Sequence, residues 1–137
     1  MKVVLENLTK IFQSRHEKGK EVVAVNNFTF TIPDGKLVGL LGPSGCGKST
    51  TLYMICGLQK PSGGKIFFGE DDVTALAPEN RGVGLVFQNY ALYPHMTVKQ
   101  NILFPLQNLR GEDKLSKEEM LKRAYDAAKL VQIDELM

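Results

Sequence analysis

Eight consecutive residues, Gly42 to Ser49, follow the spacing Gly-x-x-x-x-Gly-Lys-Ser. Phosphate oxygens have to approach a backbone closely to accept hydrogen bonds from its amides, and glycine lacks the β-carbon that would obstruct them. Lys48 adds a mobile positive charge for the terminal phosphates, and the hydroxyl of Ser49 is placed to bind Mg²⁺. These residue types at this spacing predict a loop that binds the phosphates of a nucleoside triphosphate.

A strand before this loop and a helix after it are needed to position it. Residues 36–41 (KLVGLL) form a short apolar run, typical of a strand that is buried on both faces. A helix is expected over 49–58, with Leu52, Ile55 and Cys56 on one face. Its free amino-terminal amides would point at the anion. A glycine-rich turn that fits the motif by chance is the alternative, but it does not require this strand–loop–helix order.

The other strands are expected to be short. We predict them at 2–8, 22–32 and 65–68, and at the apolar run 83–87. In the second of these, phenylalanines and an isoleucine alternate with threonines, which is typical of a half-buried strand of an antiparallel sheet. The polar, glycine-containing stretch that precedes it predicts an extended hairpin loop.

Two helices are expected in the last third of the chain. Thr97 lies three residues before Gln100, and Ser116 lies three residues before Glu119, which is the spacing of a capping box. The first helix is expected to end or kink near Pro105. The second helix is expected to pack through the set Met120, Ala124, Ala127 and Val131.

Composition and charge exclude several classes of protein. The 137 residues carry a net charge of +2, which gives no electrostatic case for binding nucleic acid. No apolar run approaches the roughly 18 residues of a membrane span, and Glu6 and Lys10 lie where a signal peptide is apolar. The two cysteines, Cys46 and Cys56, fit a reducing cytoplasm, and Cys46 is interpreted as a spacer in the loop.

Beyond the phosphate loop, the sequence resembles the ATP-binding subunits of ABC transporters. The stretches GPSGCGKSTTLYMICGLQKPSGGKIFFGEDDV and RGVGLVFQNYALYPHMTVKQNI carry this resemblance, which covers essentially the whole chain. It implies an α/β P-loop NTPase fold, with a RecA-like core and an antiparallel β subdomain, here incomplete. Residues 1–88 would form the β subdomain and P-loop core, and 89–137 the Q-loop and the start of the helical subdomain. Together, 1–137 would be the amino-terminal part of one nucleotide-binding domain.

The resemblance implies ATP and Mg²⁺ as ligands. Phe12, in LTKIF, matches the aromatic A-loop position that stacks on adenine, with a role in the core as the alternative. Gln88 matches the Q-loop glutamine, which reaches the magnesium and the attacking water; an ordinary loop residue is the alternative. The implied catalytic residues are Lys48 and Gln88, and the implied metal ligands are Ser49 and Gln88. The implied cofactor-binding residues are Phe12, Gly42, Pro43, Ser44, Gly45, Cys46, Gly47, Lys48, Ser49 and Thr50.

The segment QNYALYPHMTV resembles the subfamily that powers uptake of sugars, oligosaccharides, glycerol phosphate or polyamines. The resemblance implies a cytoplasmic place at the inner face of the cell membrane and two kinds of partner. One is a second ATPase subunit in a head-to-tail dimer. The other is the permease, contacted through Tyr90, Leu92, Tyr93, Pro94 and His95. Packing within the helical subdomain is the alternative for these side chains.

In this family the pattern continues with an LSGGQ signature, a strand ending in Asp, a catalytic Glu and a switch His, and none of these motifs is in the sequence. We therefore expect the amino-terminal portion of an ATPase subunit, able to bind nucleotide weakly but to turn it over poorly by itself. Unpaired backbone along 36–41 or 83–87 predicts self-association. A soluble non-transport ABC-type ATPase and a non-catalytic nucleotide-binding fragment remain alternatives. A small-molecule kinase would not explain the contexts of Phe12 and Gln88 together.

Overall fold

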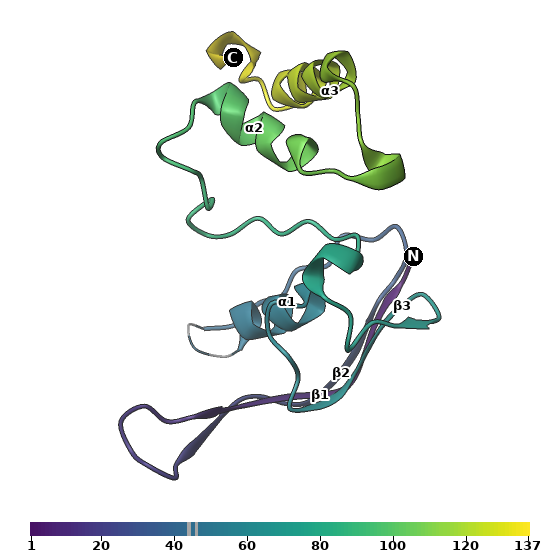
Figure 1. Cartoon of the computed structure of the whole chain (residues 1–137). Helices are drawn as coiled ribbons and strands as arrows, with labels where there is room; N and C mark the ends of the chain where they lie inside the picture. Colours follow the sequence, from purple (N-terminus) through teal and green to yellow (C-terminus); the bar gives the residue numbers. More distant parts are fainter. Residues whose placement is uncertain (44, 46) are drawn as a thin grey trace. The chain divides into compact units, whose positions relative to one another are not determined.

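The computed structural model describes residues 1–43, 45 and 47–137, and the chain divides into two compact units. The first unit is Met1–Leu85 and the second is Val86–Met137. Figure 1 labels the sheet and helix α1 in the first unit and helices α2 and α3 in the second.

An antiparallel sheet of four strands forms the framework of the first unit, in the order β2-β1-β3-β4. The strands are β1 (Val3–Gln13), β2 (Glu21–Ile32), β3 (Gly63–Phe68) and the two-residue β4 (Asp71–Asp72). The long hairpin of β1 and β2, closed by residues 14–20, confirms the antiparallel pairing expected from the alternating pattern. β1 is longer than expected and continues through Phe12.

The hydrophobic core of this unit lies between the sheet and α1 (Lys48–Cys56). The sheet contributes side chains from β1, β2 and β3, and α1 contributes Met54, which is fully buried. The members of the core are Leu5, Leu8, Val25, Met54, Ile66, Phe68 and Val73. Burial of these side chains is the main force that holds the helix carrying the phosphate loop against the sheet.

The buried face of α1 matches the expected one at two of its three positions. Cys56 is buried and Ile55 packs against the core, as expected, whereas Leu52 is 44% exposed. Thr51 and Met54 are buried as well, and the hydroxyl of Thr51 donates to the carbonyl of Gly47. This bond satisfies the hydroxyl, so a polar residue can be buried there, which a pattern that counts only apolar residues does not predict.

The prediction of strands at 36–41 and 83–87 was wrong for the structure described here. Both segments lie outside the sheet, and Leu37, Leu41 and Val86 are 102%, 94% and 84% exposed. A strand needs a neighbour to complete its hydrogen-bond ladder. Within the described residues, the sheet contains only β1 to β4, so apolar sequence alone did not make these segments strands.

Two helices and two short 3₁₀ turns make up the second unit. They are α2 (Val98–Gln107), α3 (Lys117–Leu130), η2 (Gly111–Asp113) and η3 (Asp134–Leu136), while η1 (Pro78–Asn80) belongs to the first unit. Both predicted capping boxes are confirmed, at Thr97 with Gln100 and at Ser116 with Glu119. No helix in the described part of the chain is long and apolar enough to cross a bilayer.

The end of α2, two residues past Pro105, confirms the prediction that this helix ends near that proline. The buried face of α3 differs in part from the predicted one. α3 buries Ala124 and Ala128 rather than Ala127, and Val131 is 62% exposed. Residues four apart lie on the same side of a helix, which accounts for the pair that is buried.

Candidate phosphate-binding site

The amino terminus of α1 is open to a ligand. Its N-cap, Gly47, has a left-handed backbone with φ 87° and makes no side-chain capping bond. The first backbone bond inside the helix runs from the amide of Thr51 to the carbonyl of Gly47, at 2.9 Å. Earlier amides of a helix have no acceptor within it, and the first turn of this described helix carries no acidic side chain. The geometry therefore suits an anion.

Gly47 is the position where the loop meets the sheet. A β-carbon there would lie 2.3 Å from the carbonyl oxygen of Ala24 in β2, closer than real atoms come. Together with its positive φ, this contact requires glycine. Glycine at this position therefore allows α1 to begin in close contact with β2.

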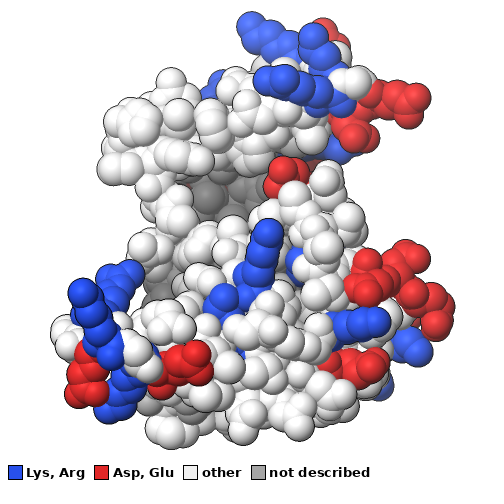
Figure 2. Space-filling model, turned by 60° about the horizontal axis from the view of Figure 1, so that its bottom comes forward, with Lys and Arg blue, Asp and Glu red and all other residues white. Residues whose placement is uncertain are grey.

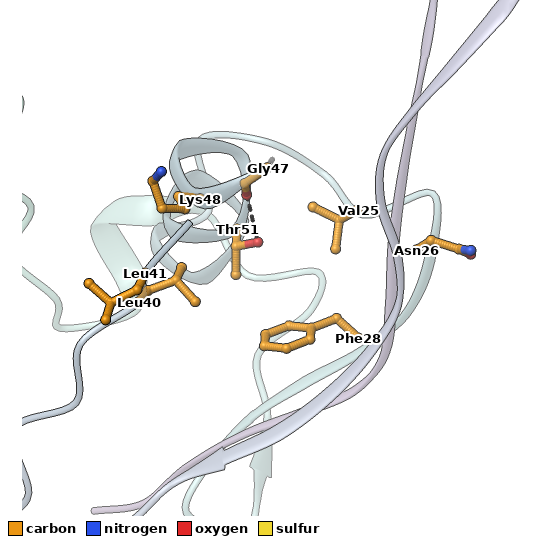
Figure 3. Close-up of a pocket in the computed structure, with 8 residues that line it drawn as sticks. All are labelled: Val25, Asn26, Phe28, Leu40, Leu41, Gly47, Lys48 and Thr51. Carbon is orange, nitrogen blue, oxygen red and sulfur yellow. Dashed lines mark hydrogen bonds between the residues drawn. The ribbon is translucent and has the colours of Figure 1, made fainter. Parts of the chain in front are cut away.

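The ammonium of Lys48 folds back over the loop. It donates to the carbonyl of Gly42 and, at 3.0 Å, to that of Pro43. In Figure 3, Lys48 lies at the start of α1, with Leu40 and Leu41 on the irregular segment below it and Val25 and Phe28 across from it on β2. A cavity of about 250 Å³ lies here, lined by Val25, Asn26, Phe28, Leu40, Leu41, Gly47, Lys48 and Thr51.

The other residues predicted for the loop differ in exposure. Gly42, Pro43 and Ser49 are exposed, Thr50 is half-buried, and Gly45 has a positive φ of 81°. Ser44 and Cys46 lie outside the described residues. The roles given to all of these in phosphate and metal binding remain predictions.

Phe12 lies on β1, opposite Val22 of β2, and is half-buried. The ammonium of Lys10 lies over its ring, 5.1 Å from the centroid. The same ammonium donates to the carbonyl of Lys60 at 2.7 Å. Sequence reasoning missed Lys10, although residues two apart on a strand share a face and this spacing was visible.

Arg81 is a second residue that the sequence reasoning did not single out. Its side chain is buried and donates to four backbone carbonyls, those of Met54, Ile55, Thr74 and Leu76, at 2.9 to 3.1 Å. Burial lowers the pKa of Arg81 from its ordinary value, and burial likewise raises the pKa of the nearby Cys56 thiol. The arginine thereby fixes the carboxyl end of α1 to the chain that follows β4.

Gln88 belongs to the second unit and is exposed. The residues after it form an irregular loop in which Tyr90 and Ala91 have left-handed φ values of 63° and 49°. Tyr90 and Leu92 are 74% and 68% exposed, while Tyr93 packs edge-on against Phe104 with centroids 5.0 Å apart. The metal role predicted for Gln88 with Ser49 remains a prediction.

Asn101, in α2, holds the end of this loop. Its side-chain oxygen accepts from the amide of Tyr93 at 2.9 Å. Its nitrogen donates to the carbonyls of Tyr93, Met96 and Thr97 at 3.0 to 3.2 Å. The side-chain amide of Asn101 thus fixes the shape of this loop, which has no regular secondary structure.

The described residues fit a magnesium nucleotide better than a metal held by the protein alone. Within that part of the chain, no group of three or more His, Cys, Asp or Glu side chains could hold a metal ion. Mg²⁺ in nucleotide sites relies on few protein ligands and on phosphate oxygens. A lysine, an exposed serine hydroxyl and free helix amides are the groups such a ligand uses.

Comparison with curated proteins gives relatives along the whole chain. An sn-glycerol-3-phosphate import ATP-binding protein of Agrobacterium fabrum is 43% identical over 136 residues, covering 99% of this chain and 36% of that protein. A glucose import ATP-binding protein of Saccharolobus solfataricus is 40% identical, covering 100% of this chain and 38% of that protein. The chain therefore spans little more than a third of the length of these relatives.

Solved structures give the same family. An ATP-binding cassette in a dimeric, post-hydrolysis state bound to ADP and Pi matches with a TM-score of 0.81 and 33% identity. The match covers 95% of this chain and 57% of that one, and it confirms the expected α/β fold of a P-loop NTPase. The family model for the ABC transporter matches residues 25–137. The resemblance seen in the sequence is confirmed: this chain belongs to the ABC transporter family.

Proposed function

We propose that this chain is the nucleotide-binding portion of an ATPase subunit that drives solute import through an ABC transporter. One observation carries the proposal. α1 begins at a left-handed glycine, has an open amino terminus, and places Lys48 over the loop that precedes it. On binding MgATP, the ammonium of Lys48 exchanges the carbonyls of Gly42 and Pro43 for phosphate oxygens.

Each predicted residue then has a defined task. The amides of Gly45 and of 47–50 would hold the β- and γ-phosphates, the hydroxyl of Ser49 would ligate Mg²⁺, and the ring of Phe12 would stack on adenine. Gln88 is the residue that would ligate the magnesium together with Ser49 and orient the attacking water. When bound, Mg²⁺ would neutralise negative charge on the phosphates.

Titration of the chain with MgATP and with inorganic triphosphate, followed by amide NMR, tests this proposal. The amides of Gly45 and of Gly47 to Thr50 should shift with both ligands, and those of β1 near Phe12 should shift with MgATP alone. Phe12→Ala should weaken MgATP binding by about 1–3 kcal/mol while leaving triphosphate binding intact. Loop amides that do not respond to either ligand would reject the phosphate site.

The chain alone binds nucleotide without efficient turnover, since the motifs for the general base and the signature are not in its sequence. Phosphate release by the purified chain should therefore stay near background. Robust phosphate release that is abolished by Lys48→Ala would overturn the expectation of poor turnover. The general-base role would then belong to a residue of this chain. This test also separates the full ATPase from a non-catalytic nucleotide-binding fragment.

We assign the imported solute to the sugars and related compounds. The similar proteins are named for the import of glycerol phosphate and glucose, and also of sulfate and polyamines. Uptake by the full-length subunit with its permease, in vesicles supplied with each solute, decides among them. A soluble ATPase without a permease would show no uptake with any of them. Figure 2 shows Lys and Arg side chains beside Asp and Glu side chains on this face, which gives no electrostatic case for binding nucleic acid.

The permease contact is proposed for the loop after Gln88, at the inner face of the membrane. Tyr90 and Leu92 are exposed, as are Pro94 and His95, and Asn101 holds the backbone between them and α2. Aromatic side chains on a loop of fixed shape suit an interface. Tyr90→Ala should lower permease-stimulated ATPase activity of the full-length subunit while leaving its MgATP affinity unchanged.

A second ATPase subunit, placed head to tail, is the other proposed partner. The similar cassette structure is dimeric. In such a dimer each phosphate loop would be completed by the signature of the opposite subunit. Sedimentation of the full-length subunit with and without MgATP measures this dimer.

A further inference from the structure

Lys10 occupies one face of the Phe12 ring. Its ammonium lies 5.1 Å from the ring centroid, within the roughly 6 Å over which a cation is attracted to an aromatic face. The carbonyl of Lys60 accepts a hydrogen bond from the same ammonium at 2.7 Å. The cation is thus fixed from two sides, and the aromatic ring is held along with it.

The carbonyl that holds Lys10 is itself held in place. The amide of Ile11 donates to the hydroxyl of Ser62 at 2.9 Å, and the amide of Ser62 donates to the carbonyl of Thr9 at 2.8 Å. These bonds fix the segment after α1 against β1 on either side of Lys10. The contact between Lys10 and Lys60 is therefore part of a small network.

The strand pairing is irregular at this point. The register of β1 against β2 shifts on both sides of Lys10, so that Ile11 pairs with Val23 and Phe12 with Val22. Such bulges redirect side chains and are common beside functional sites. Because of this shift, Ala24 of β2 has no partner in the register with β1. Its carbonyl lies against Gly47.

Lys10 is consequently linked to the phosphate loop by two routes. One runs through β2, from Phe12 and Val22 to Ala24 and Gly47. The other runs through the carbonyl of Lys60, in the segment that follows α1. Both routes end on the element that carries Lys48.

We propose that Lys10 is a positioning residue for base recognition, holding Phe12 from one face so that a purine stacks on the opposite face. This inference rests on the proposed function, in which Phe12 stacks on adenine. A cation on one side of an aromatic ring draws electron density toward itself, which favours an electron-rich purine on the other side. A ring that is already fixed also loses less conformational entropy when the base binds.

Two other roles for Lys10 make different predictions. If the ammonium contacted phosphate, its removal would weaken the binding of inorganic triphosphate as much as the binding of ATP. If it competed with the base for the same face of the ring, its removal would tighten ATP binding. A positioning role predicts weaker ATP binding and unchanged triphosphate binding.

The experiment compares Lys10→Met, Lys10→Arg and the control Lys18→Met in the full chain. Lys18 is exposed in the loop between β1 and β2, so its replacement makes the same change in charge away from the ring. Calorimetry measures the dissociation constants of MgATP and of magnesium triphosphate, and circular dichroism checks that each variant is folded. Lys10→Met should weaken the affinity for MgATP by about two- to fivefold and leave the affinity for triphosphate unchanged. Lys10→Arg, which keeps the cation, should restore ATP affinity, and Lys18→Met should match the wild type.

A spectroscopic signature supplements affinity. The chain contains no tryptophan, so Phe12→Trp introduces a single indole at this position. Stacking of adenine on that indole should quench its fluorescence. Adding Lys10→Met should reduce the quench at saturating MgATP, because the ring is then free to adopt other orientations.

The outcomes separate this inference from the proposed function. Unchanged or tighter ATP binding by Lys10→Met overturns it, and so does a parallel loss of triphosphate affinity. If Phe12→Ala weakens ATP and Lys10→Met does not, only the role of Lys10 fails. If Phe12→Ala leaves ATP affinity unchanged, the adenine assignment in the proposed function fails instead.

Discussion

The guanidinium of Arg81 donates a hydrogen bond of 2.9 Å to the carbonyl of Met54, in the last turn of α1. The opposite end of this helix carries Lys48 and the phosphate loop. A cation at the carboxyl end of a helix is favoured by the helix dipole and satisfies carbonyls that have no partner within the helix. The position of the loop is therefore fixed at both ends of α1, by Gly47 against β2 and by Arg81.

Replacement of Arg81 by alanine should destabilise the first unit by about 2–4 kcal/mol, because several buried carbonyls lose their donor at once. Arg81→Lys should recover only part of this, since an ammonium cannot reproduce the planar fork of a guanidinium. Urea unfolding followed by circular dichroism measures both variants. Equal stability of the wild type and Arg81→Ala would show that water replaces the arginine at no cost.

Gly47→Ala should weaken the binding of magnesium triphosphate by about tenfold or more. A tenfold change in the dissociation constant corresponds to a loss of about 1.4 kcal/mol in binding free energy. The added β-carbon would meet the carbonyl of Ala24 at 2.3 Å, and the residue would have to leave its left-handed conformation. Gly39→Ala is the matched control, because a β-carbon at Gly39 would meet nothing within 4 Å. A normal triphosphate affinity in Gly47→Ala would contradict the geometry described for this loop.

The buried thiol of Cys56 makes stability depend on alkaline pH. Burial raises its pKa above the ordinary 9.0, so the thiol of the unfolded chain ionises first as the pH rises. The stabilising effect is complete below the unfolded pKa and is lost as the pH rises through the folded pKa. In a Cys46→Ser background, unfolding free energies measured from pH 7.5 to 10 should decline at the alkaline end, and Cys56→Ala should flatten that decline. Rapid alkylation of native Cys56 near pH 8 would contradict its burial.

The exposed apolar segments 36–41 and 83–87 should cause the chain to self-associate. Leu37 is 102% exposed and Val86 is 84% exposed, and exposed apolar segments outside a sheet readily pair with another chain. Light scattering at rising concentration should show a growing average mass. Leu37→Lys combined with Val86→Lys should delay it. A monodisperse monomer of the wild type at high concentration would refute the prediction.

How much of this molecule could be predicted depended on the range of the interactions involved. The two capping boxes, the β1–β2 hairpin and the helix that begins after Gly47 are set by neighbours in the sequence, and the expectations for the boxes and the hairpin were confirmed. The apolar segments 36–41 and 83–87 depend on partners distant in the chain, and the sequence pattern alone misassigned them. Periodicity reports a preference for burial but not the presence of a neighbouring strand.

The residues around the site divide in the same way. The types and spacing of Gly42 to Ser49 were recognisable because a phosphate ligand imposes them. The contacts of Lys10 with Lys60 and of Arg81 with Met54 join residues that are 50 and 27 positions apart, and no local sequence pattern predicts them. Asn101 was visible only as one polar residue of a helix, and its three carbonyl acceptors come from the folded loop.

The dissociation constant of MgATP for Lys48→Ala, measured by calorimetry beside the wild type, tests the central claim most directly. Lys36→Ala, which removes an exposed lysine from the segment before the loop, is the control for charge. The account predicts measurable binding by the wild type and by Lys36→Ala, and a loss of about tenfold or more in Lys48→Ala, consistent with one lost charge-assisted contact. Equal affinities for all three folded proteins would contradict a phosphate site at the start of α1.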